Sequence, residues 1–213
     1  MSTLASPKDG GPSAQTAPTL ALQGVHHTAR PTWKLPETVH FYRDVMGLKI
    51  CHAITAKGWG PEDHPDFLHF FFDSGNGSTI AFFYYLGSQR PADPVPWDHW
   101  LYRSVHTAWR VLDRPTLMAW KERLESFGYE VMVVRHEILE SIYVTDPNDY
   151  MIEISWQMRS LGRNDAVDAR LTLEAAIEIE KETSRPVQVI DDIWRAKSRL
   201  VEQHAASGAD PDA

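Results

Sequence analysis

Apolar and polar positions along the chain follow an order that occurs twice. In each half a proline opens a stretch with apolar side chains three or four residues apart, which predicts a helix with proline in its first turn. The two stretches begin at Pro36 and Pro115, and each stops at a glycine, Gly47 or Gly128, as a left-handed C-cap requires. The predicted apolar faces are Val39, Tyr42 and Met46 in the first helix and Leu117, Trp120, Leu124 and Phe127 in the second.

Apolar and aromatic runs follow each predicted helix and predict strands. In the first half these runs cover residues 48–55 and 67–86, and in the second half residues 131–135 and 141–156. Turn sequences at residues 73–78 and 146–149 divide the longer runs. Each half therefore reads as one strand, one helix and about three further strands.

The first strand of each half starts with the same tripeptide. His27-Thr28-Ala29 is repeated as His106-Thr107-Ala108, and the proline that opens the helix follows at the same distance in both halves. A shared offset of motif and helix start indicates two copies of one βαβββ module. We assign module one to residues 19–90 and module two to residues 98–160, with a proline-containing linker at residues 87–97.

The two ends of the chain differ from the modules. Residues 1–18 are rich in Ser, Ala, Gly and Pro, so we expect a disordered lead and not a signal peptide. Residues 161–213 are polar, with helical composition at 166–183 and 187–206, and predict a helical tail. Such a tail gains stability by docking on its own sheet or on a second subunit. Of these we predict a homodimer with Trp194 as the anchor.

The composition narrows the class of protein. With 43% hydrophobic and 23% charged residues, the chain has the apolar mass for a core, and no apolar run is long enough to span a membrane. A net charge of -8 argues against nucleic acid as the main partner. The single cysteine, Cys51, excludes an intrachain disulfide framework and fits a reducing cytoplasm.

Three side chains form a candidate metal site: His27, His106 and Glu153. The histidines occupy matching positions of the repeat, so a pseudo-twofold arrangement of the modules brings them together. Glu153 lies among apolar neighbours, where a carboxylate is costly to bury without a partner such as a metal. His26 is set aside because successive strand residues face opposite sides. Two imidazoles and one carboxylate leave positions open for exogenous ligands, which suits non-haem Fe(II).

The paired modules, each with a histidine on its first strand, resemble the vicinal oxygen chelate superfamily. This superfamily includes glyoxalase I, extradiol ring-cleaving dioxygenases, epimerases and antibiotic-resistance proteins. The resemblance covers residues 20–158, and its motifs are the helix end at residues 40–48 and the last hairpin at residues 146–153. It implies an α+β fold in which two paired βαβββ modules form a cupped mixed sheet around a metal site. Here a C-terminal helical extension follows.

The resemblance also implies a reaction class. Glyoxalase I and the epimerases supply a second carboxylate from the last strand of the other module, but residues 79–86 contain no acidic residue. The nearest equivalent is Tyr84, or else Ala81. Three ligands are the arrangement of the single-domain extradiol dioxygenases. Those enzymes also have a tyrosine ten residues before the glutamate ligand, here Tyr143, and a histidine ahead of that tyrosine's strand, here His136.

We therefore expect an Fe(II)-dependent extradiol-type dioxygenase, with Mn(II) as the alternative metal, that cleaves a catechol-like aromatic diol with O2. His136 is the expected acid/base, and Tyr143 the expected hydrogen-bond donor to the substrate. Two alternatives stay open: a metal-dependent glyoxalase- or epimerase-type lyase or isomerase, and a small-molecule binding or resistance protein. The expected pocket lining is mainly aromatic: Phe82, Tyr84, Trp97, His99 and Trp156.

Overall fold

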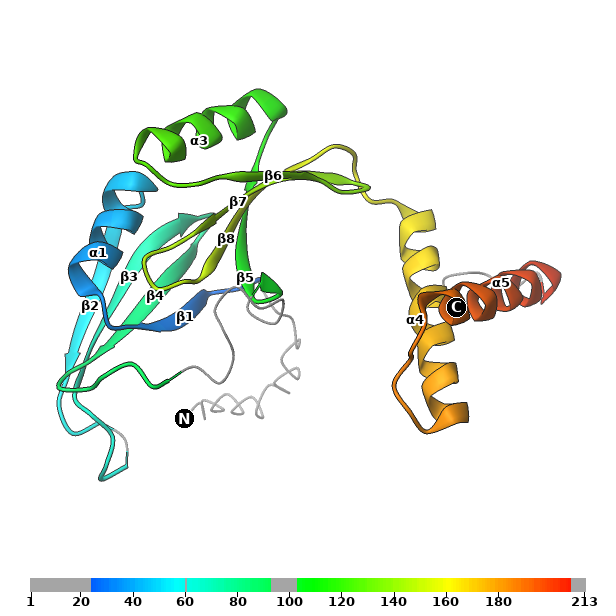
Figure 1. The fold of residues 1–213 in the computed structure, drawn as a ribbon, viewed down its shortest axis with the longest axis horizontal. Helices are drawn as coiled ribbons and strands as arrows, with labels where there is room; N and C mark the ends of the chain where they lie inside the picture. The colour runs from blue at the N-terminus through cyan, green and yellow to red at the C-terminus, as the bar shows by residue number, and fades with distance from the viewer. Residues whose placement is uncertain (1–23, 60, 93–102, 208–213) are drawn as a thin grey trace, which may run out of the picture. The chain divides into compact units, whose positions relative to one another are not determined.

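The computed structural model describes residues 24–59, 61–92 and 103–207, and the chain divides into two compact units (Figure 1). Of the described residues, unit 1 holds 24–59, 61–92 and the turn Asp146–Asp149, and unit 2 holds the rest. The predicted lead at residues 1–18 lies outside the described residues.

Unit 1 is built on a four-stranded mixed sheet in the order β1-β4-β3-β2. β1 runs parallel to β4, and the other neighbours are antiparallel. A short helix and a π-helical segment follow β1 and lie on one face of the sheet (Figure 1). The bounds are β1 His27–Thr32, α1 Leu35–Val39, η1 His40–Val45, β2 Ile50–Ala56, β3 Phe67–Gly75 and β4 Ser78–Tyr85.

The first predicted helix begins where expected but changes its winding. Pro36 lies in the first turn, and Gly47 has a φ of 69° just after the helix ends. The segment His40–Val45 is wound as a π-helix, and Phe41, Tyr42 and Val45 in it are fully buried. The Tyr42 ring lies 4.7 Å from the ring of Phe82, so this face of the sheet forms the core of unit 1.

Unit 2 repeats the same topology, with the strand order β5-β8-β7-β6 and β5 parallel to β8. The side chain of Asp113 accepts a hydrogen bond from the Thr116 N–H and caps the helix, which buries Leu117 and Leu124. Phe127, predicted on the buried face, is 43% exposed because the helix ends before it. The bounds are β5 His106–Val111, α3 Arg114–Ser126, β6 Met132–Arg135, β7 Leu139–Thr145 and β8 Met151–Gln157.

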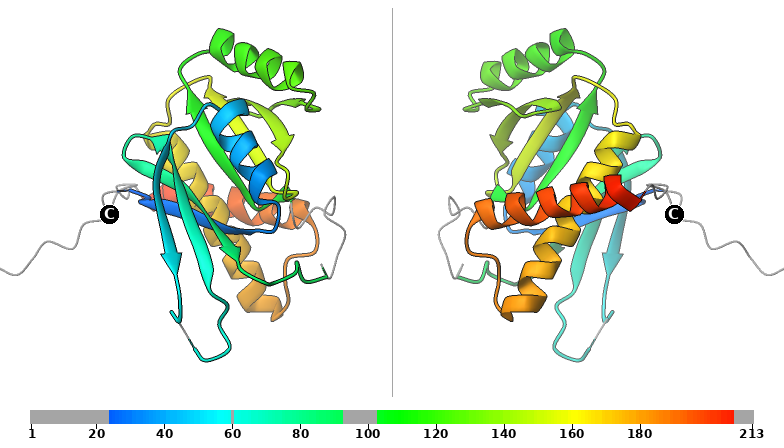
Figure 2. Two further views of the ribbon diagram at one scale, coloured as in Figure 1. Left: turned by 90° about the vertical axis from the view of Figure 1, so that its left-hand side faces the viewer. Right: turned by 90° about the vertical axis from the view of Figure 1, so that its right-hand side faces the viewer.

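The tail of unit 2 consists of two helices, α4 (Arg163–Thr183) and α5 (Ile190–Ser207). α5 packs against α4 and crosses it (Figure 2). No helix in the described part of the chain is both long and apolar enough to cross a membrane. Two mixed sheets with helices and a helical C-terminal extension confirm the predicted α+β class.

The turn Asp146–Asp149 is joined to unit 1 by buried side-chain hydrogen bonds. The Thr32 hydroxyl donates to Oδ1 of Asn148 at 2.8 Å, and Nδ2 of Asn148 donates to the Thr38 hydroxyl at 2.9 Å. The Tyr42 hydroxyl donates to Oδ2 of Asp146 at 2.9 Å. Because all of these groups are buried, the turn completes the polar interior of unit 1.

Candidate metal centre

Glu153 lies on β8 with only 4% of its surface exposed, yet its carboxylate has several donors. The hydroxyls of Ser155 and Tyr143 donate to Oε1 at 2.7 and 3.0 Å. Burial alone raises the pKa of Glu153, but hydrogen bonds from Ser141, Ser155 and Tyr143, and the nearby His106, outweigh it and hold the pKa below its usual value. The buried carboxylate is therefore kept in its charged form.

His106, at the start of β5, faces the second oxygen of that carboxylate. Its Nε2 lies 2.8 Å from Oε2 of Glu153, and its Nδ1 lies 3.1 Å from the backbone carbonyl oxygen of Arg103. A carbonyl can only accept, so Nδ1 carries the proton in this hydrogen bond. A histidine held in this way directs Nε2 into the site, which is the arrangement that metal-binding histidines generally have.

Tyr143 connects Glu153 to His136. β7 and β8 pair Tyr143 directly opposite Glu153, and the Tyr143 hydroxyl lies 2.9 Å from Nε2 of His136. Burial, followed by the neighbouring Glu153, raises the pKa of Tyr143 to about 12, so the phenol keeps its proton. The ten-residue spacing between Tyr143 and Glu153 thus corresponds to a direct contact.

His27 lies at the start of β1 in unit 1. Its Nδ1 is 2.9 Å from Nδ1 of His26, and its ring is 6.0 Å from the ring of Phe71. Within the described part of each unit, no three His, Cys, Asp or Glu side chains gather as a metal-binding group. The structure thus brings together two of the three predicted ligands, His106 and Glu153, and His27 belongs to the other unit.

The register of the two sheets identifies the module-one counterpart of Glu153. In unit 2, Ala108 pairs with Glu153; in unit 1, the matching Ala29 pairs with Ala81. Ala81 therefore occupies the equivalent position, and Tyr84 does not. Alanine has no donor atom, so the first module supplies no second carboxylate there.

The sheet register places three of the predicted pocket residues. Phe82 and Tyr84 lie one and three positions after Ala81, and Trp156 lies three positions after Glu153, and successive strand residues face opposite sides. Phe82 is fully buried against Tyr42, on the face that forms the core of unit 1. Tyr84 and Trp156 lie on the face away from Ala81 and Glu153, respectively. Trp97 and His99 lie outside the described residues.

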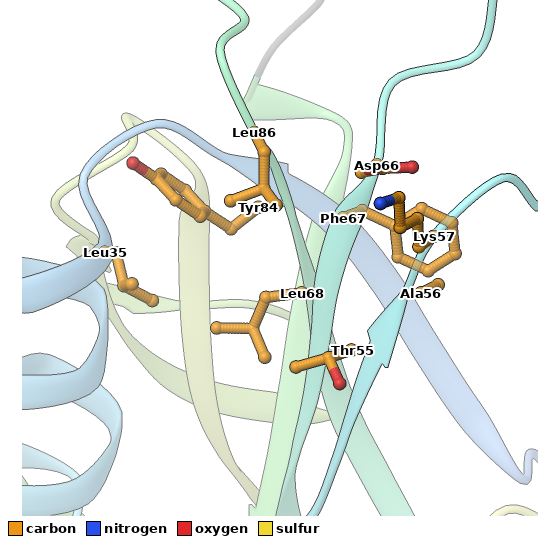
Figure 3. Close-up of a pocket in the computed structure, with 9 residues that line it drawn as sticks. All are labelled: Leu35, Thr55, Ala56, Lys57, Asp66, Phe67, Leu68, Tyr84 and Leu86. Carbon is orange, nitrogen blue, oxygen red and sulfur yellow. The ribbon is translucent and has the colours of Figure 1, made fainter.

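Tyr84 instead lines a cavity of about 440 Å³ in unit 1, together with Leu35 of α1 and Leu68 of β3 (Figure 3). Leu68 and Tyr84 are paired across β3 and β4, on the same face as the helix. His27 lies on the opposite face, so this cavity is separate from the candidate metal centre.

Two serines of the candidate centre escaped the sequence analysis. The hydroxyls of Ser141 and Ser155 lie 2.9 Å apart and are buried beside Glu153. A polar residue two positions after Glu153 in an otherwise apolar strand was the available signal for Ser155, since such residues share one face. Ser141 could be found only from the pairing of β7 with β8.

Comparison with known proteins identifies the family. The family model described as Glyoxalase/Bleomycin resistance protein/Dioxygenase superfamily matches residues 24–154. The chain belongs to this superfamily. Its members include lyases, dioxygenases and some binding proteins, many bind divalent metals, and they are often dimers that act on small molecules.

Several solved structures resemble this chain at low sequence identity. Lactoylglutathione lyase from Agrobacterium tumefaciens is 22% identical, with 64% of this chain and 95% of that chain covered and a TM-score of 0.46. The fosfomycin resistance protein FosX from Listeria monocytogenes, complexed with Mn(II), is 17% identical, with 66% and 96% covered and a TM-score of 0.45. A glyoxylase/bleomycin resistance protein/dioxygenase domain from Frankia sp. EAN1pec is 18% identical, with 64% and 99% covered and a TM-score of 0.47. A comparison with curated proteins returns no match.

Proposed function

We propose that this protein is an Fe(II)-dependent extradiol-type dioxygenase that cleaves a catechol-like aromatic diol with O2, with its metal bound by His27, His106 and Glu153. The observation that carries the proposal is the hydrogen-bonded chain from His136 through Tyr143 to Glu153, on the sheet face that also presents His106. Mn(II) is the alternative metal.

The residues present fit a divalent first-row metal. Imidazole and carboxylate are the donors that such a metal prefers, and both His106 and Glu153 are already oriented by further hydrogen bonds. With Ala81 at the equivalent position of module one, the proposed protein ligands number three and leave room for an exogenous diol and O2. When bound, the metal lowers the pKa of a phenol and passes electron density to O2.

His136 is the proposed acid/base, and Tyr143 the proposed hydrogen-bond donor. The Tyr143 hydroxyl has one proton and donates it to Glu153, so the hydrogen bond with His136 runs from Nε2–H of His136 to the tyrosine oxygen. His136 is exposed and can exchange protons with solvent. Tyr143 therefore keeps its proton and acts as a hydrogen-bond donor, and His136 is the proposed acid/base.

Specific features of the site argue against the two other candidate functions. A glyoxalase- or epimerase-type lyase or isomerase is expected to have a second carboxylate, and Ala81 stands at that position. Burying a charged carboxylate costs free energy, and a metal-free binding or resistance protein would gain nothing in return from the buried Glu153 beside His106. Both observations favour the dioxygenase.

The test is oxygen uptake by protein that is purified without oxygen and reconstituted with Fe(II). We expect consumption of O2 in step with loss of a catechol, and a yellow ring-opened product. Turnover of a thiohemiacetal or an acyl-CoA thioester without O2 would place the protein among the isomerases and lyases. Binding of the catechol without metal and without turnover would place the protein among the binding proteins.

Variants at the three ligands test the metal site in the same assay. His27→Ala, His106→Ala and Glu153→Ala should each abolish tight metal binding and activity, because each removes one of three protein donors. His40→Ala is the matched control, since His40 lies on the π-helical segment and forms an exposed pair with Asp44. Full metal occupancy in any of the three ligand variants would contradict the assignment.

A further inference from the structure

α5 presents an apolar seam that is left uncovered in the described part of the chain. Ile190, Trp194 and Val201 are 57%, 60% and 45% exposed. Their spacing, completed by Lys197, runs four, three and four residues, which places all four side chains along one line of the helix. This 4-3-4 spacing is the pattern by which one helix packs along another.

The same seam contains a hollow and the side chain that fits it. Trp194, Lys197, Ser198 and Val201 line a cavity of about 410 Å³ together with Glu202. The first four are related as i, i+3, i+4 and i+7, the arrangement of the hole that accepts a knob in knobs-into-holes packing. Trp194 is the largest exposed side chain on the seam, so the helix carries both the knob and the hole.

The hairpin of α4 and α5 needs an additional partner. Between them the two helices bury Leu171, Ala175 and Ala196. A long side chain and two alanines are a small core for a helix pair, since short helices in water depend on packing of an apolar face. The exposed side chains of the α5 seam supply apolar surface on which a further partner can pack.

Charge indicates which helix meets a second copy of the chain. The exposed Leu173 and Ile177 of α4 lie close in sequence to Glu174, Glu178 and Glu180, so two copies of that face would repel each other. α5 carries three acidic and three basic side chains: Asp191, Asp192, Glu202, Arg195, Lys197 and Arg199. Lys197 of the seam is paired with Asp168 of α4. Pairing of α5 with itself therefore brings no net repulsion.

We propose that α5 pairs antiparallel with α5 of a second copy of this chain, with Trp194 of each copy in the hollow beside Lys197 of the other. In this register Ile190 of one copy lies opposite Val201 of the other. The Lys197 ammonium group is paired with Asp168 of α4, at 2.6 Å between Nζ and Oδ1. The aliphatic part of the Lys197 side chain therefore lines the hollow that receives the facing indole. The pairing is isologous, as expected of a twofold dimer. It is independent of the reaction proposed above.

Cysteine cross-linking tests the register in a Cys51→Ser background. Residues 190 and 201 of one helix lie about 16 Å apart along its axis, too far for a disulfide within the chain. We expect the double variant Ile190→Cys, Val201→Cys to form disulfide-linked dimers at least about tenfold more than either single variant, because each single cysteine lies about 16 Å from its symmetry mate. Absence of cross-linking in the double variant overturns the proposal. Cross-linking of both single variants overturns it too, since it indicates parallel helices.

Dimer dissociation supplies a second measurement. Trp194→Ala should raise the dissociation constant of the dimer by about tenfold or more in sedimentation experiments, since buried tryptophans at such positions carry much of the binding free energy. Trp59→Ala is the matched control, because Trp59 is 58% exposed in unit 1. An unchanged dissociation constant in Trp194→Ala, or an equal change in Trp59→Ala, contradicts the assignment of the interface to α5.

Discussion

Glu153 keeps its charge in a nearly closed position because hydrogen bonds and the nearby His106 outweigh the effect of burial. Ser155 and Tyr143 hold Oε1, and His106 faces Oε2. An unpaired carboxylate with 4% exposure would otherwise take up a proton. The hydrogen bonds that stabilise the ionised carboxylate also fix its orientation. The residues around Glu153 therefore control how readily it binds a metal.

Tyr143→Phe should weaken metal binding and shift its pH dependence. The change removes one of the hydrogen bonds that lower the pKa of Glu153, so this pKa should rise. A carboxylate with a lowered pKa binds metal above that pKa and loses the metal as the pH falls through it, so the variant should lose metal at a higher pH. We expect metal affinity near neutral pH to fall about 10- to 100-fold.

Metal affinity measured by competition with a chelator, between about pH 4 and 7, checks this expectation. Tyr84→Phe is the control, since Tyr84 lies in unit 1 on the face away from Ala81. A Tyr143→Phe profile that superimposes on the profile of the unchanged protein would show that Tyr143 does not act on Glu153.

At the scale of elements, the repeat was sufficient to predict both modules. Pro36 and Pro115 mark the helix starts, and Gly47 and Gly128 adopt positive φ just beyond the helix ends, so local backbone chemistry determined these boundaries. The faces of β4 could not be predicted. Both faces of that strand carry large apolar side chains, so no alternation of polar and apolar residues distinguishes them.

The turn Asp146–Asp149 should contribute to the stability of unit 1 through its buried hydrogen bonds. Asn148→Ala should destabilise unit 1 by about 2–4 kcal/mol, because it removes two buried hydrogen bonds and leaves the hydroxyls of Thr32 and Thr38 with one partner fewer. Urea unfolding measures the change. Asn164→Ala, an exposed position at the start of α4, should stay within about 0.5 kcal/mol of the unchanged protein. Equal effects of the two substitutions would remove the special role of the turn.

For the whole molecule, the family and the two-module plan followed from the repeat, whereas the assignment of the turn to unit 1 did not. That assignment depends on side chains over a hundred residues apart, such as Tyr42 and Asp146, and a single sequence carries no pattern that pairs them. The winding of η1 likewise escaped prediction, since the same residues also fit an ordinary α-helix.

Removal of residues 161–213 should leave both sheets folded and the metal affinity within about threefold of the full chain, since α4 and α5 pack chiefly on each other. The strands of unit 2 that contact α3, namely β5, β7 and β8, remain in the shortened chain. Circular dichroism and metal titration of the shortened chain test this. Loss of the sheet signal on truncation would show that the hairpin belongs to the core of unit 2.

The turn that completes unit 1 also sets an order of events during synthesis. Tyr42 leaves the ribosome 104 residues before Asp146, the carboxylate that accepts its hydroxyl proton. At the usual pace of translation this delay lasts roughly 5 to 20 s, during which the buried groups of the first module lack their partners. The first module of the nascent chain is therefore exposed to chaperones and proteases until most of the second module has been made. The first module therefore completes its folding only after the turn in the second module has been synthesised.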